Sequence, residues 1–128
     1  MGQQQPVKAR PLSPHLQIYK PMLTMMMSIF HRLTGVGLYF GALVFTWWLM
    51  AAASGPEYYN WVMDLLATLP GMLVLILVSW AFFHHMLGGI RHFIWDFGKG
   101  FELATVEMMA WVNLVGAIVL TALFWLFI

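Results

Sequence analysis

The sequence contains no cysteine, and only 9% of its 128 residues are charged. The absence of cysteine excludes disulfide frameworks, thiolate metal sites, iron–sulfur clusters and covalent c-type haem attachment on this chain. Soluble domains are about one quarter charged, so the low charge content argues against a water-soluble fold. The formal net charge is +1 and there is no basic run, so nucleic acid is not an expected partner.

Hydrophobic residues make up 62% of the chain, and the mean hydropathy is +0.80. Three stretches carry no charged residue, and each is close to the roughly 20 residues that cross about 30 Å of hydrocarbon as a helix. They are Leu33–Pro56, Leu65–Phe83 and Met108–Ile128. We therefore predict an all-α integral membrane protein. It would consist of an N-terminal segment, 1–21, and a single three-helix domain, 22–128, with transmembrane helices at about 22–53, 66–95 and 102–127.

The polar stretch Met1–Lys20 lacks the apolar core of a secretory signal and the Arg- and Ser-rich pattern of a transit peptide. We therefore expect a complete chain, bacterial rather than organellar. Basic residues precede the first span or flank the Trp95–Glu102 loop, whereas the Ser54–Asp64 loop has none. The positive-inside rule then predicts a bacterial cytoplasmic (inner) membrane protein with a cytoplasmic N-terminus and a periplasmic C-terminus.

Ionisable side chains inside membrane spans are candidates for function because their burial is costly. Here they gather towards the predicted cytoplasmic ends of the first two spans. Ser28, His31 and Arg32 lie three or four residues apart on the first span, so a helix places them on one face. The second group comprises His84, His85, Arg91, His92 and Asp96. Similar depth in the membrane would allow the two groups to form one site.

His85 and His92 are seven residues apart, so a helix places them on one stripe. Gly88 and Gly89, between them, leave that stripe without side chains. A flat macrocycle packed against a helix needs such a bare patch, and histidine is a common haem iron ligand. His92 lies about 10 Å further along the helix, where it or Arg91 could meet a carboxylate at the haem edge.

Other interpretations of these residues remain open. The glycines could serve close helix packing, as the G-x-x-x-G pair Gly37 and Gly41 would on the first span. Arg32, Arg91 and His92 could be basic side chains that reach the membrane interface. His84 is expected to face lipid headgroups or a partner, and the methionines to provide adaptable packing. His15 is expected on the surface.

Three motifs together resemble the cytochrome b subunit of succinate dehydrogenase. They are the stretch from Arg10 to Tyr19, the Ser-x-x-His-Arg-x-Thr-Gly block from Ser28 to Gly35, and the His-x₆-His segment from His85 to His92, followed by Trp95-Asp96. The order, spacing and three-helix layout agree from about Arg10 to Ile128. The resemblance implies that this chain forms half of a heterodimeric helical bundle with a second small membrane-anchor subunit.

The resemblance also implies cofactors and site residues. His85 would be one axial ligand of the iron of haem b, and the partner anchor would supply the other. Ser28 and Arg32 would contribute to a ubiquinone site, and His31, Arg32 and His92 would lie near the haem propionates. Flavin and iron–sulfur clusters would be held only by the flavoprotein and iron–sulfur partner subunits.

Chemistry supports this division of roles. Reduction of a quinone creates oxyanions, which a hydroxyl such as Ser28 and a fixed cation such as Arg32 can stabilise. Asp96, at a helix end, is a possible proton entry group, although a helix cap or a salt bridge would equally explain it. No residue of this chain is expected to be catalytic for succinate.

Three other functions fit parts of this pattern. The chain could be the anchor of a fumarate reductase-type quinol oxidoreductase working in the opposite direction. A haem-free structural membrane scaffold would explain the spans but not the His85 stripe. A transporter is disfavoured, because no polar group is expected at the bilayer midplane.

Overall fold

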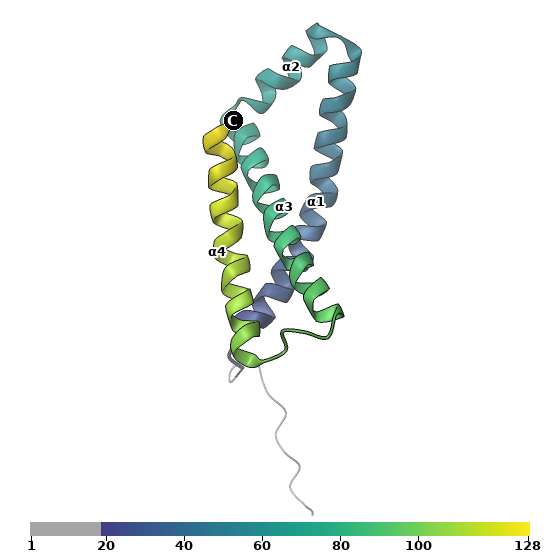
Figure 1. Cartoon of the computed structure of the whole chain (residues 1–128). Helices are drawn as coiled ribbons and strands as arrows, with labels where there is room; N and C mark the ends of the chain where they lie inside the picture. Colours follow the sequence, from purple (N-terminus) through teal and green to yellow (C-terminus); the bar gives the residue numbers. More distant parts are fainter. Residues whose placement is uncertain (1–18) are drawn as a thin grey trace, which may run out of the picture.

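The computed structural model describes residues 19–128, and within them it contains four helices and no strand (Figure 1). The helices are α1 (Leu23–Ser54), α2 (Pro56–Leu66), α3 (Leu69–Asp96) and α4 (Leu103–Phe127). Of these, α1, α3 and α4 are long and apolar enough to cross a membrane. The predicted all-α, three-span fold class is confirmed. The predictions for His15 and for the motif residues before Tyr19 lie outside the described residues.

The first span, α1, is 32 residues long, or about 48 Å at 1.5 Å per residue. It is therefore longer than the hydrocarbon core of a bilayer. It ends at Ser54, and the next residue, Gly55, has a φ of 110°, in a region that side chains disfavour. The chain can turn sharply there because this position is a glycine.

Residues 54–64 were predicted as a loop, and this prediction was wrong, because Pro56–Leu66 forms α2. Pro56 occupies the first turn of α2, where its missing N–H costs no hydrogen bond, and Glu57 favours a helix start. The indole Nε1 of Trp47 donates a hydrogen bond of 2.8 Å to the Tyr58 hydroxyl. The short helix is thus tied to the end of α1 through aromatic side chains.

The second span, α3, begins at Leu69 rather than at the predicted residue 66. The side chain of its N-cap residue, Thr68, accepts a hydrogen bond from the backbone N–H of Gly71, and Pro70 lies in the first turn. A turn containing Gly98 and Gly100, both with positive φ, leads to α4. The predicted loop between the second and third spans is confirmed, between Asp96 and Leu103.

The third span, α4, packs along α3, and Figure 1 shows the two running side by side over most of their length. The buried residues of α4 are Ala110, Asn113, Ala117 and Thr121, and all of these but Asn113 are small. The buried residues of α3 are Ala81, His84, Gly88 and Arg91, of which Ala81 and Gly88 are small. Small side chains allow membrane helices to approach closely, so van der Waals packing can hold them together.

Of the two α1 glycines predicted to allow close helix packing, only Gly41 does so. A Cβ added to Gly41 would lie 2.8 Å from the side chain of Val78 on α3, so this glycine serves close packing. A Cβ added to Gly37 would meet nothing within 4 Å. Gly37 therefore faces outwards, towards lipid or a partner.

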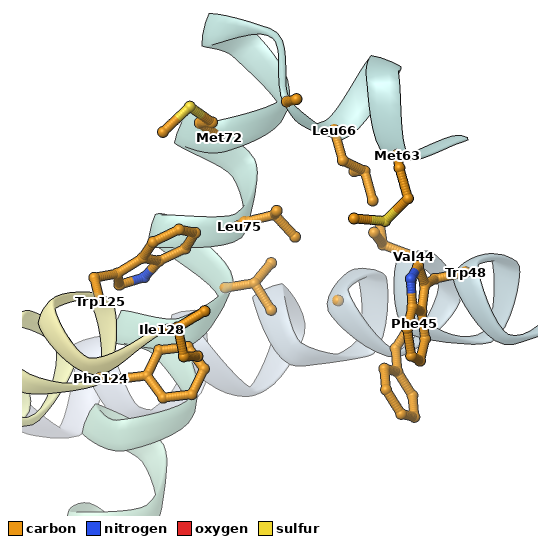
Figure 2. Close-up of a pocket in the computed structure, with 13 residues that line it drawn as sticks. Val44, Phe45, Trp48, Met63, Leu66, Met72, Leu75, Phe124, Trp125 and Ile128 are labelled. Carbon is orange, nitrogen blue, oxygen red and sulfur yellow. The ribbon is translucent and has the colours of Figure 1, made fainter. Parts of the chain in front are cut away.

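Towards the α2 end, α1 and α3 diverge, and an apolar cavity of about 640 Å³ lies between them (Figure 2). All four helices contribute to its wall. Figure 2 shows Val44, Phe45 and Trp48 on one side and Phe124, Trp125 and Ile128 on the other. Its labelled side chains are apolar or aromatic, so it offers no acid–base or ligand chemistry of its own.

Candidate functional site

Three histidine rings from two helices come together at the end of the bundle opposite α2. His31 on α1 stacks on His85 of α3, with ring centroids 3.9 Å apart and planes within 7°. His92 lies about two helical turns after His85 on the same face of α3. The centroid of its ring is 5.1 Å from that of the His31 ring. We call His31, His85 and His92 the imidazole cluster. Of the two polar groups predicted at similar depth, His31 of the first meets His85 and His92 of the second.

The imidazole of His85 is oriented by the backbone of α1. Its Nδ1 lies 3.0 Å from the backbone oxygen of His31 and 3.4 Å from Oγ1 of Thr34. The Thr34 hydroxyl donates to the carbonyls of Phe30, at 2.8 Å, and His31, at 3.0 Å, so its oxygen remains free to accept. A carbonyl can only accept, so the hydrogen bond to His31 requires the proton of His85 to be on Nδ1. The lone pair of the neutral ring is then on Nε2.

Two glycines make room for the cluster. A Cβ at Gly35 of α1 would lie 3.1 Å from Cε1 of His85, and a Cβ at Gly88 of α3 would overlap the His31 ring. Each histidine thus packs against a glycine of the opposite helix. Gly88 therefore serves close helix packing, which was one of the two interpretations left open.

Gly89 has the opposite environment. A Cβ there would meet nothing within 4 Å. Gly89 lies four residues after His85, on the same helical face, so the space beside His85 is open along one turn of α3. The sequence predicted a stripe without side chains at both Gly88 and Gly89. Because His31 covers Gly88, only Gly89 leaves open space on α3.

The remaining predicted site residues are at the surface of the chain. Ser28 and Arg32 are exposed, one turn apart on α1. His92 is exposed as well, with its ring edge-on to Trp95 at 5.3 Å. Asp96 is exposed and is the last residue of α3. These side chains are accessible to a ligand or to another subunit.

His84 does not face outwards, and that prediction was wrong. Its side chain is fully buried, with Phe30 and Trp80 as aromatic neighbours, and neither ring nitrogen has a hydrogen-bond partner. Arg91 is only 4% exposed, so it is not a side chain that extends over the surface of the chain, as one interpretation expected. Both residues lie on the buried face of α3 together with Gly88.

Sequence reasoning missed three residues. Thr34 and Gly35 belong to the quoted motif, but their roles beside His85 depend on how α1 packs against α3. Asn113, 2% exposed on α4, is a buried amide well inside the third span. The available signal was that Asn113 is the one amide side chain in that uncharged stretch.

Among residues 19–128 no group of three or more histidine or acidic side chains could hold a metal ion. A metal at the imidazole cluster would therefore need ligands from elsewhere. The fold and this cluster define a multi-pass membrane protein that presents one oriented imidazole, with a free Nε2, at one end of its bundle.

Comparisons with known proteins identify the family. The sequence profile of the succinate dehydrogenase/fumarate reductase transmembrane subunits matches residues 6–124, and the chain belongs to this family. The succinate dehydrogenase cytochrome b556 subunit of Rickettsia conorii is 40% identical over 116 residues, which cover 91% of this chain and 90% of that protein. The resemblance seen in the sequence motifs is confirmed.

More distant relatives extend the same likeness. The cytochrome b556 subunit of Paracoccus denitrificans is 36% identical, covering 89% of this chain and 88% of that protein. The mitochondrial cytochrome b560 subunit of Mus musculus is 34% identical, covering 89% of this chain and 66% of that protein. Together these relatives support a succinate dehydrogenase membrane anchor of the cytochrome b type.

Proposed function

We propose that this chain holds haem b together with a second membrane-anchor subunit and forms part of a ubiquinone-reduction site in a succinate dehydrogenase complex. The observation that carries the proposal is the hydrogen bond from His85 Nδ1 to the backbone oxygen of His31, next to the open space at Gly89. This arrangement explains why an ionisable side chain is retained inside a span.

The donor set of the site fits a haem. Metal-binding histidines characteristically donate their second ring N–H to a carbonyl or carboxylate, which sets the tautomer and the ring orientation. His85 does so, and its Nε2 would be the axial ligand. A bare helix face at Gly89 would accept a flat macrocycle. When bound, the haem would supply a one-electron redox centre.

The other members of the cluster suit the polar edge of such a cofactor. His31 and His92 lie beside the His85 ring, and Arg32 is the next residue on α1 after His31. Cationic or hydrogen-bonding groups at this place would hold the propionates. Within residues 19–128, His85 is the only histidine oriented by a hydrogen bond to a backbone carbonyl, so the second axial ligand would come from a partner anchor.

The quinone site would use Ser28 and Arg32. Both are exposed on α1, one turn apart, so they can approach a ligand held between this chain and its partners. A hydroxyl donor and a fixed cation would stabilise the oxyanions that form when a quinone is reduced. Asp96, exposed at the end of α3, would pass protons from the aqueous side.

We expect no residue of this chain to oxidise succinate, so electrons would come from a flavoprotein subunit through an iron–sulfur subunit. The complex would lie in the bacterial cytoplasmic membrane, with the imidazole cluster towards the cytoplasm. A fumarate reductase anchor is the second candidate, because the family description covers both enzymes. The names of the relatives favour succinate dehydrogenase.

The test uses membranes that contain the complete complex. His85→Ala should abolish the reduced-minus-oxidised spectrum of the b-type haem. Ser28→Ala and Arg32→Gln should lower ubiquinone reduction by at least about tenfold, because each loses a hydrogen bond to a developing charge. Succinate oxidation with a soluble artificial acceptor should persist in the Ser28 and Arg32 variants.

Ser54→Ala is the matched control, because Ser54 is an exposed serine at the opposite end of α1 whose hydroxyl bonds only the carbonyl of Met50. It should leave ubiquinone reduction unchanged. An unaltered haem spectrum in His85→Ala would contradict the axial-ligand assignment. Equal loss of both activities in Ser28→Ala and Arg32→Gln would contradict the quinone role and indicate failed assembly.

A further inference from the structure

A second polar site lies between α3 and α4, away from the imidazole cluster. It is a cavity of about 200 Å³ whose only charged lining residue is Arg91 and whose other polar lining residue is Asn113. The apolar lining residues are Leu87, Ile90, Ile94, Met108, Met109 and Val112. None of His31, His85 and His92 contributes to it, so it belongs to a different face of α3.

The polar groups of this cavity lack partners. The guanidinium of Arg91 lies over the Trp95 ring, 4.9 Å from its centroid, but its buried Nε and Nη1 donate to nothing within residues 19–128. In Asn113, which is 2% exposed, both the amide nitrogen and the amide oxygen are buried without a partner. Buried polar groups in proteins are almost always hydrogen-bonded, and a buried cation needs a counter-charge.

The missing counter-charge must come from outside this part of the chain, because no carboxylate lines the cavity. Glu107 of α4 is exposed and is not among the lining residues. A water molecule occupies about 30 Å³ of liquid, so the cavity has room for more than a single water. A hydrated anionic group would fit the space and pair with Arg91.

The rim of the cavity indicates what carries that anion. Four large apolar side chains, Ile90, Ile94, Met108 and Val112, are between 36% and 58% exposed around it. A free anion in water would gain nothing from such a rim, whereas hydrocarbon chains would bury it. Arg91 lies about one and a half turns before the end of α3, close to the depth at which lipid headgroups meet a span.

We propose that Arg91 and Asn113 bind the phosphate group of a phospholipid whose acyl chains cover the exposed rim on α3 and α4. Arg91 and the Asn113 amide nitrogen donate to the phosphate oxygens, and the Asn113 oxygen accepts from a headgroup hydroxyl or a bound water. The bound lipid would hold α3 and α4 together at this end of the bundle. This site does not depend on haem or quinone binding.

Thermal unfolding of the purified, delipidated complex in detergent tests the proposal. Added short-chain phosphatidylglycerol should raise the Tm in a concentration-dependent way, because a ligand that binds only the folded state stabilises it. In Arg91→Gln the phosphatidylglycerol concentration that gives half of the maximal Tm increase should rise at least about tenfold. Asn113→Leu should also raise this half-maximal concentration. The variant is less prone to misfolding, because leucine replaces a buried amide that has no hydrogen-bond partner.

Two ligand controls and one variant separate the alternatives. Diacylglycerol with the same chains, and inorganic phosphate alone, should each leave the Tm unchanged. Lys99→Gln removes an exposed cation outside the cavity and should respond to phosphatidylglycerol like the wild type. The proposal is overturned if diacylglycerol stabilises equally, if inorganic phosphate alone gives the full effect, or if both cavity variants titrate like the wild type.

Discussion

Two adjacent histidines of α3 have opposite environments. His84 is fully buried and neither of its ring nitrogens has a hydrogen-bond partner. His85 is half-buried and is oriented by the carbonyl of His31. Successive residues on a helix point about 100° apart, so the packing of α1 and α4 decides which of the two is enclosed. Only His85 has the geometry of a ligand.

We predict that His84→Leu leaves the haem spectrum unchanged and leaves the Tm of the complex unchanged or higher. A buried polar group without a partner costs about 1–3 kcal/mol, and an apolar side chain of similar size removes that cost. Difference spectra and thermal unfolding of the purified complex measure both effects. Loss of haem in this variant, with His85 intact, would contradict the assignment of distinct roles.

At the residue scale, the sequence predicted which side chains share a helix face, but not which of them the neighbouring helices bury. Helical spacing was sufficient to group Ser28, His31 and Arg32, and to place His85 and His92 on one stripe. Spacing within one helix carries no information on the neighbouring helix. The contacts of His85 with Thr34 and Gly35, and the burial of His84, therefore required the structure.

At the scale of elements, glycines form two pairs in which one member faces the bundle and the other faces outwards. Gly41 packs against Val78 and Gly88 against His31, whereas a Cβ at Gly37 or Gly89 would meet open space. The inward glycines set the distance between α1 and α3. The outward glycines leave bare surface for something outside this chain.

The adjacent glycines of α3 give a matched test. Gly88→Leu would force α1 and α3 apart, and overpacking of this kind costs about 1–3 kcal/mol, so the amount of chain in the membrane should fall. Gly89→Leu should leave that amount unchanged but lower the haem content, since leucine would fill the open space beside His85. Immunoblots and difference spectra of membranes measure both. Equal haem content in wild type and Gly89→Leu would disprove the proposed haem contact.

Sequence reasoning missed α2, because the Gly55-Pro56 pair is compatible both with a loop and with the start of a new helix. Gly55-Pro56 marks the end of α1, but proline is also favoured in the first turn of a helix. The aromatic residues that follow are also typical of a membrane interface, so they do not by themselves indicate a helix. Tyr58 and Trp61, whose rings stack 5.9 Å apart, are both residues of α2. The long spans were predictable because uncharged runs of such length have no alternative in a membrane.

At the scale of the whole molecule, charge is distributed unequally between the two ends. The start of α1 and the α3–α4 turn lie at one end, and α2 lies at the other (Figure 1). Lys20 and Lys99 belong to the first end, and the acidic residues Glu57 and Asp64 belong to α2. The positive-inside rule therefore predicts that the end with the imidazole cluster faces the cytoplasm.

The absence of cysteine allows this orientation to be tested without background labelling. Single variants Lys99→Cys and Glu57→Cys place one exposed thiol at each end of the bundle. A membrane-impermeant maleimide added to intact spheroplasts should label Glu57→Cys, while Lys99→Cys should react only in inverted vesicles. The reverse pattern would place the imidazole cluster at the periplasmic face. The proposed quinone site would then lie across the membrane from an iron–sulfur subunit in the cytoplasm, which would make direct electron transfer between them untenable.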